Sequence, residues 1–211
     1  MTTVLLTGFS PFAGDARNPS EEVVRDVAQQ WEGEERLVTE ILPVAYDAAG
    51  SRLRELIAEH IPDVIIAVGL AGGRTAVTPE RVAINLRDAR IPDNAGARPV
   101  DEPSVPGGPA AHFATLPVKA IVRDITRAGI PAAVSDTAGT FVCNHTFYVA
   151  ADAAATTDAR AGFIHVPWSA ETAPDGAPSI AHADLVRAIG IAIRTTLGTT
   201  RDLREPAGDT H

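Results

Sequence analysis

Cys143 is the only cysteine of this 211-residue chain and its strongest candidate nucleophile. It lies where small residues 135–140 lead from a predicted strand into a predicted Ala-rich helix. A thiol at a helix N-terminus is close to the positive end of the helix dipole and to free backbone N–H groups, which stabilise a thiolate and can bind an oxyanion. A free cysteine is also commonly a small buried hydrophobe. The local sequence leaves both interpretations open.

A cysteine nucleophile needs a base, and the predicted elements separate the histidine candidates. His165 closes a predicted strand, and ligand sites in parallel sheets form at the carboxyl ends of strands, so His165 is the favoured base. A hydrogen-bonded structural histidine at a strand end is the alternative. His145 follows Cys143 by two residues, and a helix would turn it about 200° away, whereas an extended segment would make it a rival. The others are His60 at the end of a polar helix, His112 in a Pro-rich loop, His182 in the last helix and the terminal His211.

Glu80 is a candidate for the group that orients the imidazole, because it follows the Gly-rich end of a predicted strand. Thr78, Pro79 and Glu80 also match a helix start, with a Thr cap and Pro at the first helical position, and the residues alone slightly favour that reading. The Gly-rich segment 69–74 lacks the Lys-Ser/Thr of a P-loop and the spacing of a dinucleotide-binding fingerprint, so it is weak evidence for nucleotide binding.

Short apolar runs alternate with amphipathic segments along the chain. This alternation predicts an α/β fold, namely a three-layer α/β/α sandwich with a mainly parallel, twisted mixed sheet. The predicted strands are 4–7, 37–44, 64–68, 132–135 and 162–166, and the predicted helices are 18–31, a segment around 53–57, 117–128, a segment after Cys143, and 179–197.

Two segments depart from the alternation. Residues 87–116 contain five prolines and several glycines, and a loop of this length is usually a binding loop, a lid or an interface arm, although an irregular surface excursion is the alternative. Residues 198–211 lack apolar periodicity, which predicts a flexible tail. We expect a single domain over residues 1–211.

Composition excludes several classes of protein. The formal net charge of −9 argues against nucleic-acid or anionic-membrane binding. One cysteine allows neither an internal disulfide nor a Cys-based zinc site. The longest apolar run, 64–71, is far shorter than the roughly 20 residues of a membrane span, and the N-terminus lacks the basic start of a signal peptide. We therefore expect a cytoplasmic protein.

Five blocks of sequence, in order over about residues 3–195, resemble the pyroglutamyl peptidase I family, also called pyrrolidone-carboxylate peptidase. They are TGFSPFAG at 7–14 with NPS at 18–20, GLAGGR at 69–74 running into PERVAIN at 79–85, ARIPDN at 89–94, SDTAGTFVCN at 135–144, and HVP at 165–167. Two positions depart from the family. Ala13 stands where the family commonly has Gly and Leu70 where some members have Gln, which affects the fine shape of the expected pocket.

The resemblance implies a role for each matched position. Cys143 would be the nucleophile, His165 its base and Glu80 the acid that orients His165. The resemblance therefore favours this role for Glu80 over the alternative of a helix start. The substrate pocket would include Phe9, Phe12, Leu70, Ile91, Phe141 and Val142, with Arg90 near the oxyanion site.

The implied activity is that of a cysteine exopeptidase without metal or organic cofactor. It would hydrolyse the amide bond after an N-terminal pyroglutamyl (5-oxoprolyl) residue of a peptide, through a thioester. The flat, uncharged lactam would fit between aromatic rings. Two other classes remain: a phosphorylase-like nucleoside enzyme with Arg74 and the glycines holding phosphate, and a non-catalytic binder of pyroglutamyl peptides. A homo-oligomer, dimer or tetramer, is compatible with the Pro-rich loop.

Overall fold

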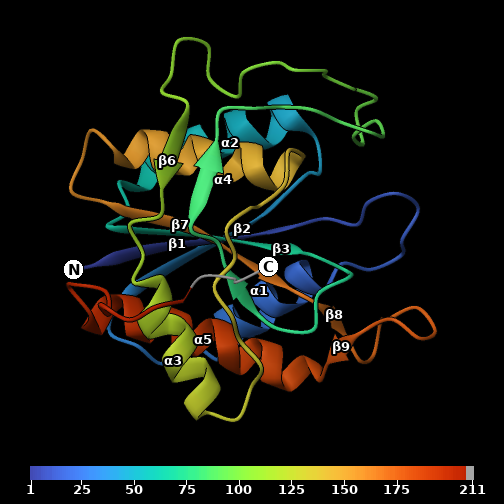
Figure 1. Cartoon of the computed structure of the whole chain (residues 1–211). Helices are drawn as coiled ribbons and strands as arrows, with labels where there is room; N and C mark the ends of the chain where they lie inside the picture. The colour runs from blue at the N-terminus through green and yellow to red at the C-terminus, as the bar shows by residue number, and fades with distance from the viewer. Residues whose placement is uncertain (208–211) are drawn as a thin grey trace.

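The main sheet has five strands in the computed structural model, which describes residues 1–207. Their order across the sheet is β2 (Arg36–Leu42), β1 (Thr3–Phe9), β3 (Val64–Leu70), β7 (Arg160–Val166) and β4 (Thr78–Pro79) (Figure 1). The first four run parallel, and β4 runs antiparallel to β7. The predicted α/β fold with a mainly parallel mixed sheet is confirmed.

Helices cover both faces of this sheet. In Figure 1, α2 (Tyr46–His60) and α4 (Val142–Ala154) lie above it, and α1 (Pro19–Gln29), α3 (Val118–Arg127) and α5 (His182–Gly198) lie below it. Each face has its own buried apolar cluster, one shared with α2 and α4 and the other with α1, α3 and α5. The molecule therefore has the expected three layers.

The sequence of β1 and β3 explains why they lie in the centre. Every residue of β1 is buried; Val4 and Leu6 belong to the cluster on one face, while Leu5 and Phe9 belong to the cluster on the other. A parallel strand buried on both faces needs such a continuous apolar run. The register pairs Gly69 with His165, so the carboxyl ends of β3 and β7 meet at the same edge of the sheet.

The predicted continuous strand at 132–135 is wrong. This segment runs parallel to residues 77–81 and forms only isolated bridges, at Ala132 and Ser135. Backbone N–H groups of Val77, Ala133, Ser135 and Arg81 bond across the two segments. Pro79, in the middle of the pairing, has no N–H to donate, and this gap interrupts the ladder. Because Thr78–Pro79 is a strand, the alternative of a helix start at this point is also wrong.

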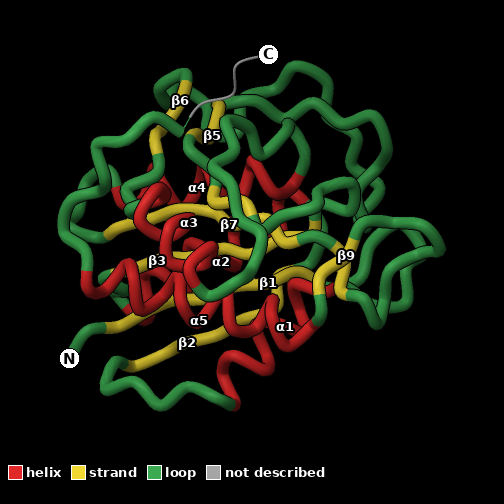
Figure 2. The backbone as a smooth tube through the Cα atoms, turned by 60° about the horizontal axis from the view of Figure 1, so that its bottom comes forward, coloured by secondary structure: helices red, strands yellow, loops and turns green. Residues whose placement is uncertain are grey.

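Two short strands, β6 and β9, lie in segments predicted as loop and as helix. Inside the Pro-rich segment, β6 (Ala111–Phe113) pairs with β5 (Val82–Ile84), away from the main sheet in Figure 2. The side chain of Asn85 holds the loop between them, donating to the carbonyls of Val105 and Gly108 and accepting from the Val105 N–H. The last helix starts later than predicted, because Ser179–Ile180 forms β9 with β8 (Trp168–Ser169).

The described part of the C-terminal segment contacts the body of the molecule. The carboxylate of Asp202 accepts hydrogen bonds from the backbone N–H groups of Lys119 and Ala120, at 3.1 and 2.9 Å, and so caps α3. Arg81 donates to the carbonyl of Ala207 at 2.8 Å. Of the predicted flexible tail, residues 208–211 lie outside the described residues. Within residues 1–207, no helix is both long and apolar enough to cross a lipid bilayer.

Candidate active site

A cavity of about 280 Å³ opens at the carboxyl ends of β1, β3 and β7. This is the edge at which ligands bind in parallel α/β sheets. The cavity contains both a thiol and an imidazole within a mostly apolar wall. Its lining residues are Phe9, Phe12, Asp15, Arg17, Asn18, Val44, Leu70, Ala138, Phe141, Val142, Cys143 and His165.

Cys143 lies in the first turn of α4, directly over the end of β3. A Cβ atom placed on Gly69 would lie 3.0 Å from the Cys143 sulfur and 2.7 Å from the ring of Phe163. Only glycine leaves room for the thiol at this position. Because Gly69 is the register partner of His165, the thiol and the imidazole lie above adjacent strands and line the same cavity.

His165 is held by a carboxylate on the side away from the cavity. Its Nδ1 lies 2.7 Å from Oε1 of Glu80, which is fully buried, and the His165 side chain is nearly so. The backbone N–H of Glu80 donates to the carbonyl of Phe163 in β7, which fixes the segment after β4 against the strand that carries His165. A carboxylate bonded to Nδ1 keeps the proton on that nitrogen and leaves Nε2 free to accept one.

The thiol and the imidazole are both neutral in the resting site. Burial, with a further contribution from the nearby charge of Glu80, raises the pKa of Cys143 to about 12. Burial also lowers the pKa of His165, although Glu80 opposes this effect. At Cys143, desolvation outweighs the charge of Arg74 and a backbone hydrogen bond, which both favour the thiolate. The raised pKa of Cys143 leaves little thiolate at neutral pH.

Alkylation with iodoacetamide tests this protonation state, because only the thiolate reacts. A pKa above the ordinary value leaves less thiolate at neutral pH, so Cys143 should react at pH 7 about 100-fold more slowly than a free cysteine. The rate should still be rising above pH 9. Mass spectrometry of the modified protein over pH 6–10 measures it, with free cysteine in the same buffers as the control. A rate that levels off below pH 8 would show a preformed thiolate and contradict this state.

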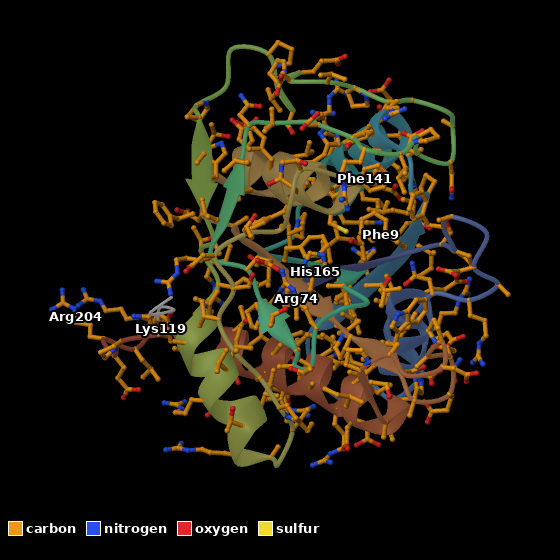
Figure 3. All side chains as sticks on the ribbon, turned by 45° about the vertical axis from the view of Figure 1, so that its right-hand side comes forward. Phe9, Arg74, Lys119, Phe141, His165 and Arg204 are labelled. Atoms are coloured by element: carbon orange, nitrogen blue, oxygen red, sulfur yellow. The ribbon has the colours of Figure 1, made fainter. Side chains whose placement is uncertain are left out.

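Aromatic side chains form one wall of the cavity. The rings of Phe12 and Phe141 are 5.1 Å apart between centroids, and the rings of Tyr46 and Phe141 pack edge to face with centroids 5.4 Å apart. The hydroxyl of Tyr46 donates to the carbonyl of Thr140, which fixes the residue before Phe141. Figure 3 shows Phe9, Phe141 and His165 grouped in the middle of the molecule.

Five of the seven residues predicted for the substrate pocket line the cavity, namely Phe9, Phe12, Leu70, Phe141 and Val142. The structure does not bring Arg90 and Ile91 into the lining, because both are exposed on a loop. This loop is bonded to segments beside the cavity: Asp88 exchanges hydrogen bonds with Thr140, and Asn94 donates its backbone N–H to the carbonyl of Val44 and its side-chain amide to the carbonyl of Pro11.

Sequence reasoning missed the remaining lining residues, which are Asp15, Arg17, Asn18, Val44 and Ala138. Only Asn18 carried a local signal, as the predicted helix start; its side chain accepts from the Ser20 N–H and caps α1. The two departures from the family pattern lie beside the same cavity. Leu70 lines it, and Ala13 has a φ of 56°, the left-handed region in which glycine is favoured.

The other histidines are placed elsewhere. His145 lies in α4, where helical geometry turns it away from Cys143, as predicted for a helix; it packs on the ring of Tyr46, and burial lowers its pKa to about 4. Three more lie beside carboxylates: His60 near Glu59, His112 near Asp152 and His182 near Asp26. His211 lies outside the described residues. His165 is the histidine that the described structure brings to the thiol.

Comparisons with known proteins find one family over nearly the whole chain. A family model described as pyroglutamyl peptidase matches residues 2–199. The pyrrolidone-carboxylate peptidase of Cupriavidus necator is 50% identical over 100% of both chains, and that of Clavibacter michiganensis is 47% identical over 99% of both.

Solved structures of the same family are also similar to this chain. The pyroglutamyl peptidase I of Bacillus amyloliquefaciens superimposes with a TM-score of 0.92 at 48% identity, over 97% of this chain and 99% of that one. A mutant pyrrolidone carboxyl peptidase from Pyrococcus furiosus superimposes with a TM-score of 0.90 at 40% identity, over 93% of this chain and 99% of that one. The chain belongs to the pyroglutamyl peptidase family of cysteine peptidases.

Proposed function

We propose that this protein removes an N-terminal pyroglutamyl residue from peptides, with Cys143 as nucleophile and His165 as general base and acid. The observation that carries the proposal is the shared cavity, in which the thiol lies above the strand beside His165 while Glu80 holds His165 from behind. Membership of the family supports the choice of reaction. Glu80 acts by fixing the orientation and tautomer of the imidazole.

The reaction proceeds in two stages. First, Nε2 of His165 takes the thiol proton while the Cys143 sulfur attacks the carbonyl carbon of the pyroglutamyl residue. The tetrahedral intermediate collapses as His165 gives its proton to the leaving amine, and the shortened peptide departs. A water molecule then attacks the thioester, with His165 again accepting the proton. This second stage releases pyroglutamate and restores the free thiol.

The start of α4 can stabilise the oxyanion of each tetrahedral intermediate. Within residues 1–207, the N-cap residue Phe141 makes no side-chain hydrogen bond to this helix, so its first backbone N–H groups, near Cys143, are free to donate. One such donor contributes about 3 kcal/mol in enzymes where it has been removed. The positive end of the helix dipole adds to the same stabilisation.

The cavity wall favours a cyclised N-terminus. Pyroglutamate presents a flat, uncharged lactam, which suits the apolar space beside Phe9, Phe12 and Phe141. An ordinary peptide would bring a charged ammonium group into this space. Desolvating that charge without a partner costs several kcal/mol, which accounts for rejection of uncyclised peptides.

The geometry supports the nucleoside phosphorylase alternative less well. That reading requires Arg74 to bind phosphate, but Arg74 donates to Glu80, to the Thr78 hydroxyl and to the carbonyl of Thr137. A non-catalytic binder would need an inert thiol, whereas Cys143 lines the same cavity as His165.

Two amides of one fluorescent amine test the proposed substrate class. Wild-type protein should release the amine from the pyroglutamyl amide, and kcat/KM for the prolyl amide should be lower by about 10³-fold or more, because the prolyl ring nitrogen is protonated. The prolyl compound is a matched control, since its ring has the same size. No release from the pyroglutamyl amide, or cleavage of a nucleoside that depends on phosphate, would overturn the proposal.

We also infer that residues 1–211 form one domain that works in the cytoplasm as a homo-oligomer. Both apolar clusters pack on the same sheet, which supports a single domain. The lone cysteine suits a reducing compartment. Ile91 and Val100 are large exposed apolar side chains on the Pro-rich loop, where an interface with a second copy would cover them.

A further inference from the structure

Arg74 lies behind the proposed catalytic residues and contacts one of them directly. Its Nη1 is 2.6 Å from Oε1 of Glu80 and also donates to the Thr78 hydroxyl. Its Nη2 donates to the carbonyl of Thr137 at 3.0 Å. Figure 3 shows Arg74 close to His165. Arg74 is not among the residues that line the cavity.

The buried negative charge of Glu80 requires a positively charged partner such as Arg74. Glu80 is fully buried, and a buried carboxylate is costly unless a positive charge and hydrogen bonds compensate it. Its Oε1 receives both His165 and Arg74, while Oε2 is buried without a hydrogen-bond partner among the described residues. Because His165 is neutral at rest, Arg74 supplies the positive charge at this carboxylate.

Arg74 also joins two parts of the site that are far apart in sequence. Glu80 follows β4, whereas Thr137 belongs to the segment that leads to Phe141 and to Cys143 at the start of α4. The guanidinium bonds to both parts through different nitrogens. A planar guanidinium suits such a double contact, which the single ammonium of a lysine could not reproduce in full.

We propose that Arg74 is a positioning residue of the peptidase, which compensates the buried Glu80 carboxylate and fastens it to the segment preceding Cys143. This inference rests on the proposed function. It predicts that Arg74 acts on catalysis through Glu80 and His165 without contacting the substrate.

The direction of the electrostatic effect follows from the charges around the thiol and imidazole. Glu80 and Arg74 are the charged groups that act on both, and Tyr46 faces Cys143 from α2. The positive charge of Arg74 lowers the pKa of His165 and that of Cys143. Removing this charge should raise both values, so both limbs of the pH–rate profile should move to higher pH.

Arg74→Met tests the proposal, since it keeps an unbranched side chain but removes the charge. We expect kcat for the pyroglutamyl amide to fall by about 10² to 10³-fold, while KM stays within threefold of the wild-type value. Both limbs of the pH–rate profile should move to higher pH. Arg74→Lys should restore the wild-type profile and part of kcat. Arg25→Met, at an exposed arginine of α1, is the matched control and should behave as wild type.

Two further measurements separate positioning from general destabilisation. In a Glu80→Gln background, Arg74→Met should cost little more activity, because the two residues act as one unit. NMR titration of His165 should show a higher midpoint in Arg74→Met, and this readout does not depend on turnover, so it stands even if the proposed substrate is wrong. The proposal would be overturned if the activity losses of Arg74→Met and Glu80→Gln were additive. It would also be overturned if Arg74→Met left the titration midpoint of His165, or the pH–rate profile, as in the wild type.

Discussion

Cys143→Ala is expected to lower kcat for a fluorogenic pyroglutamyl amide by about 10⁶-fold, as loss of the nucleophile does in serine proteases. Alanine removes the atom that would carry the acyl group, and the chain has no other cysteine to replace it. The rate of amine release at saturating substrate, compared between the two proteins, measures the effect.

Two controls make this result specific to the thiol. Cys143→Ser keeps the shape of the side chain and should also be strongly impaired, because a hydroxyl is a much weaker nucleophile at the same site. Both variants should unfold at nearly the wild-type temperature, since Cys143 lines the cavity and is only partly buried at the edge of the core. If Cys143→Ala kept activity within tenfold of wild type, the assignment of the nucleophile would be wrong.

Glu80→Gln is expected to lower kcat by about 10³ to 10⁴-fold, the range found when the orienting carboxylate of a catalytic triad becomes an amide. The glutamine can donate an N–H to Nδ1 of His165, which moves the imidazole proton to Nε2 and leaves no base beside the thiol. Steady-state kinetics on the pyroglutamyl amide should show the loss mainly in kcat.

A surface glutamate supplies the comparison for that variant. Glu55 pairs with Arg52 on the exposed side of α2, so Glu55→Gln should leave kcat and KM unchanged. A Glu80→Gln protein with kcat within tenfold of wild type would show that His165 does not depend on this carboxylate.

The length of each strand decided how much of the fold could be predicted. Runs such as residues 64–68 are long and apolar enough to identify a strand buried on both faces, and β3 includes them. Thr78–Pro79 and Ser179–Ile180 have two residues each, too few for any periodicity. Such short strands form only because neighbouring segments present their backbone groups, which is information from the tertiary structure.

The same difference between local sequence patterns and tertiary contacts explains which residues of the site could be predicted. Cys143 and His165 could be selected because a helix start and a strand end each place a side chain at the ligand-binding edge of a parallel sheet. Glu80 is a candidate for which the residues alone slightly favour a helix start, since its contact with His165 depends on the antiparallel pairing of β4 with β7. The contact of Arg74 with Glu80 gave no local signal either: an arginine after glycines also suggests phosphate binding. The resemblance to a known family identified Glu80 where local patterns favoured a helix start.

The pKa of the thiol could not be predicted from sequence for a related reason. A helix start indicates the direction in which the dipole acts on Cys143, but the desolvation that raises its pKa depends on how closely the surrounding elements pack. Gly69 and Phe163, from two different strands, are examples of these neighbours.

An activated pyroglutamyl ester gives the most direct test of the proposed thioester. With a good leaving group, acylation becomes faster than hydrolysis of the acyl-enzyme, so the intermediate accumulates. We predict a burst of one alcohol per protein molecule, and acid quenching followed by peptide mapping should place the pyroglutamyl group on Cys143. A pyroglutamyl group on any other residue, or a burst that persists in Cys143→Ala, would contradict the account.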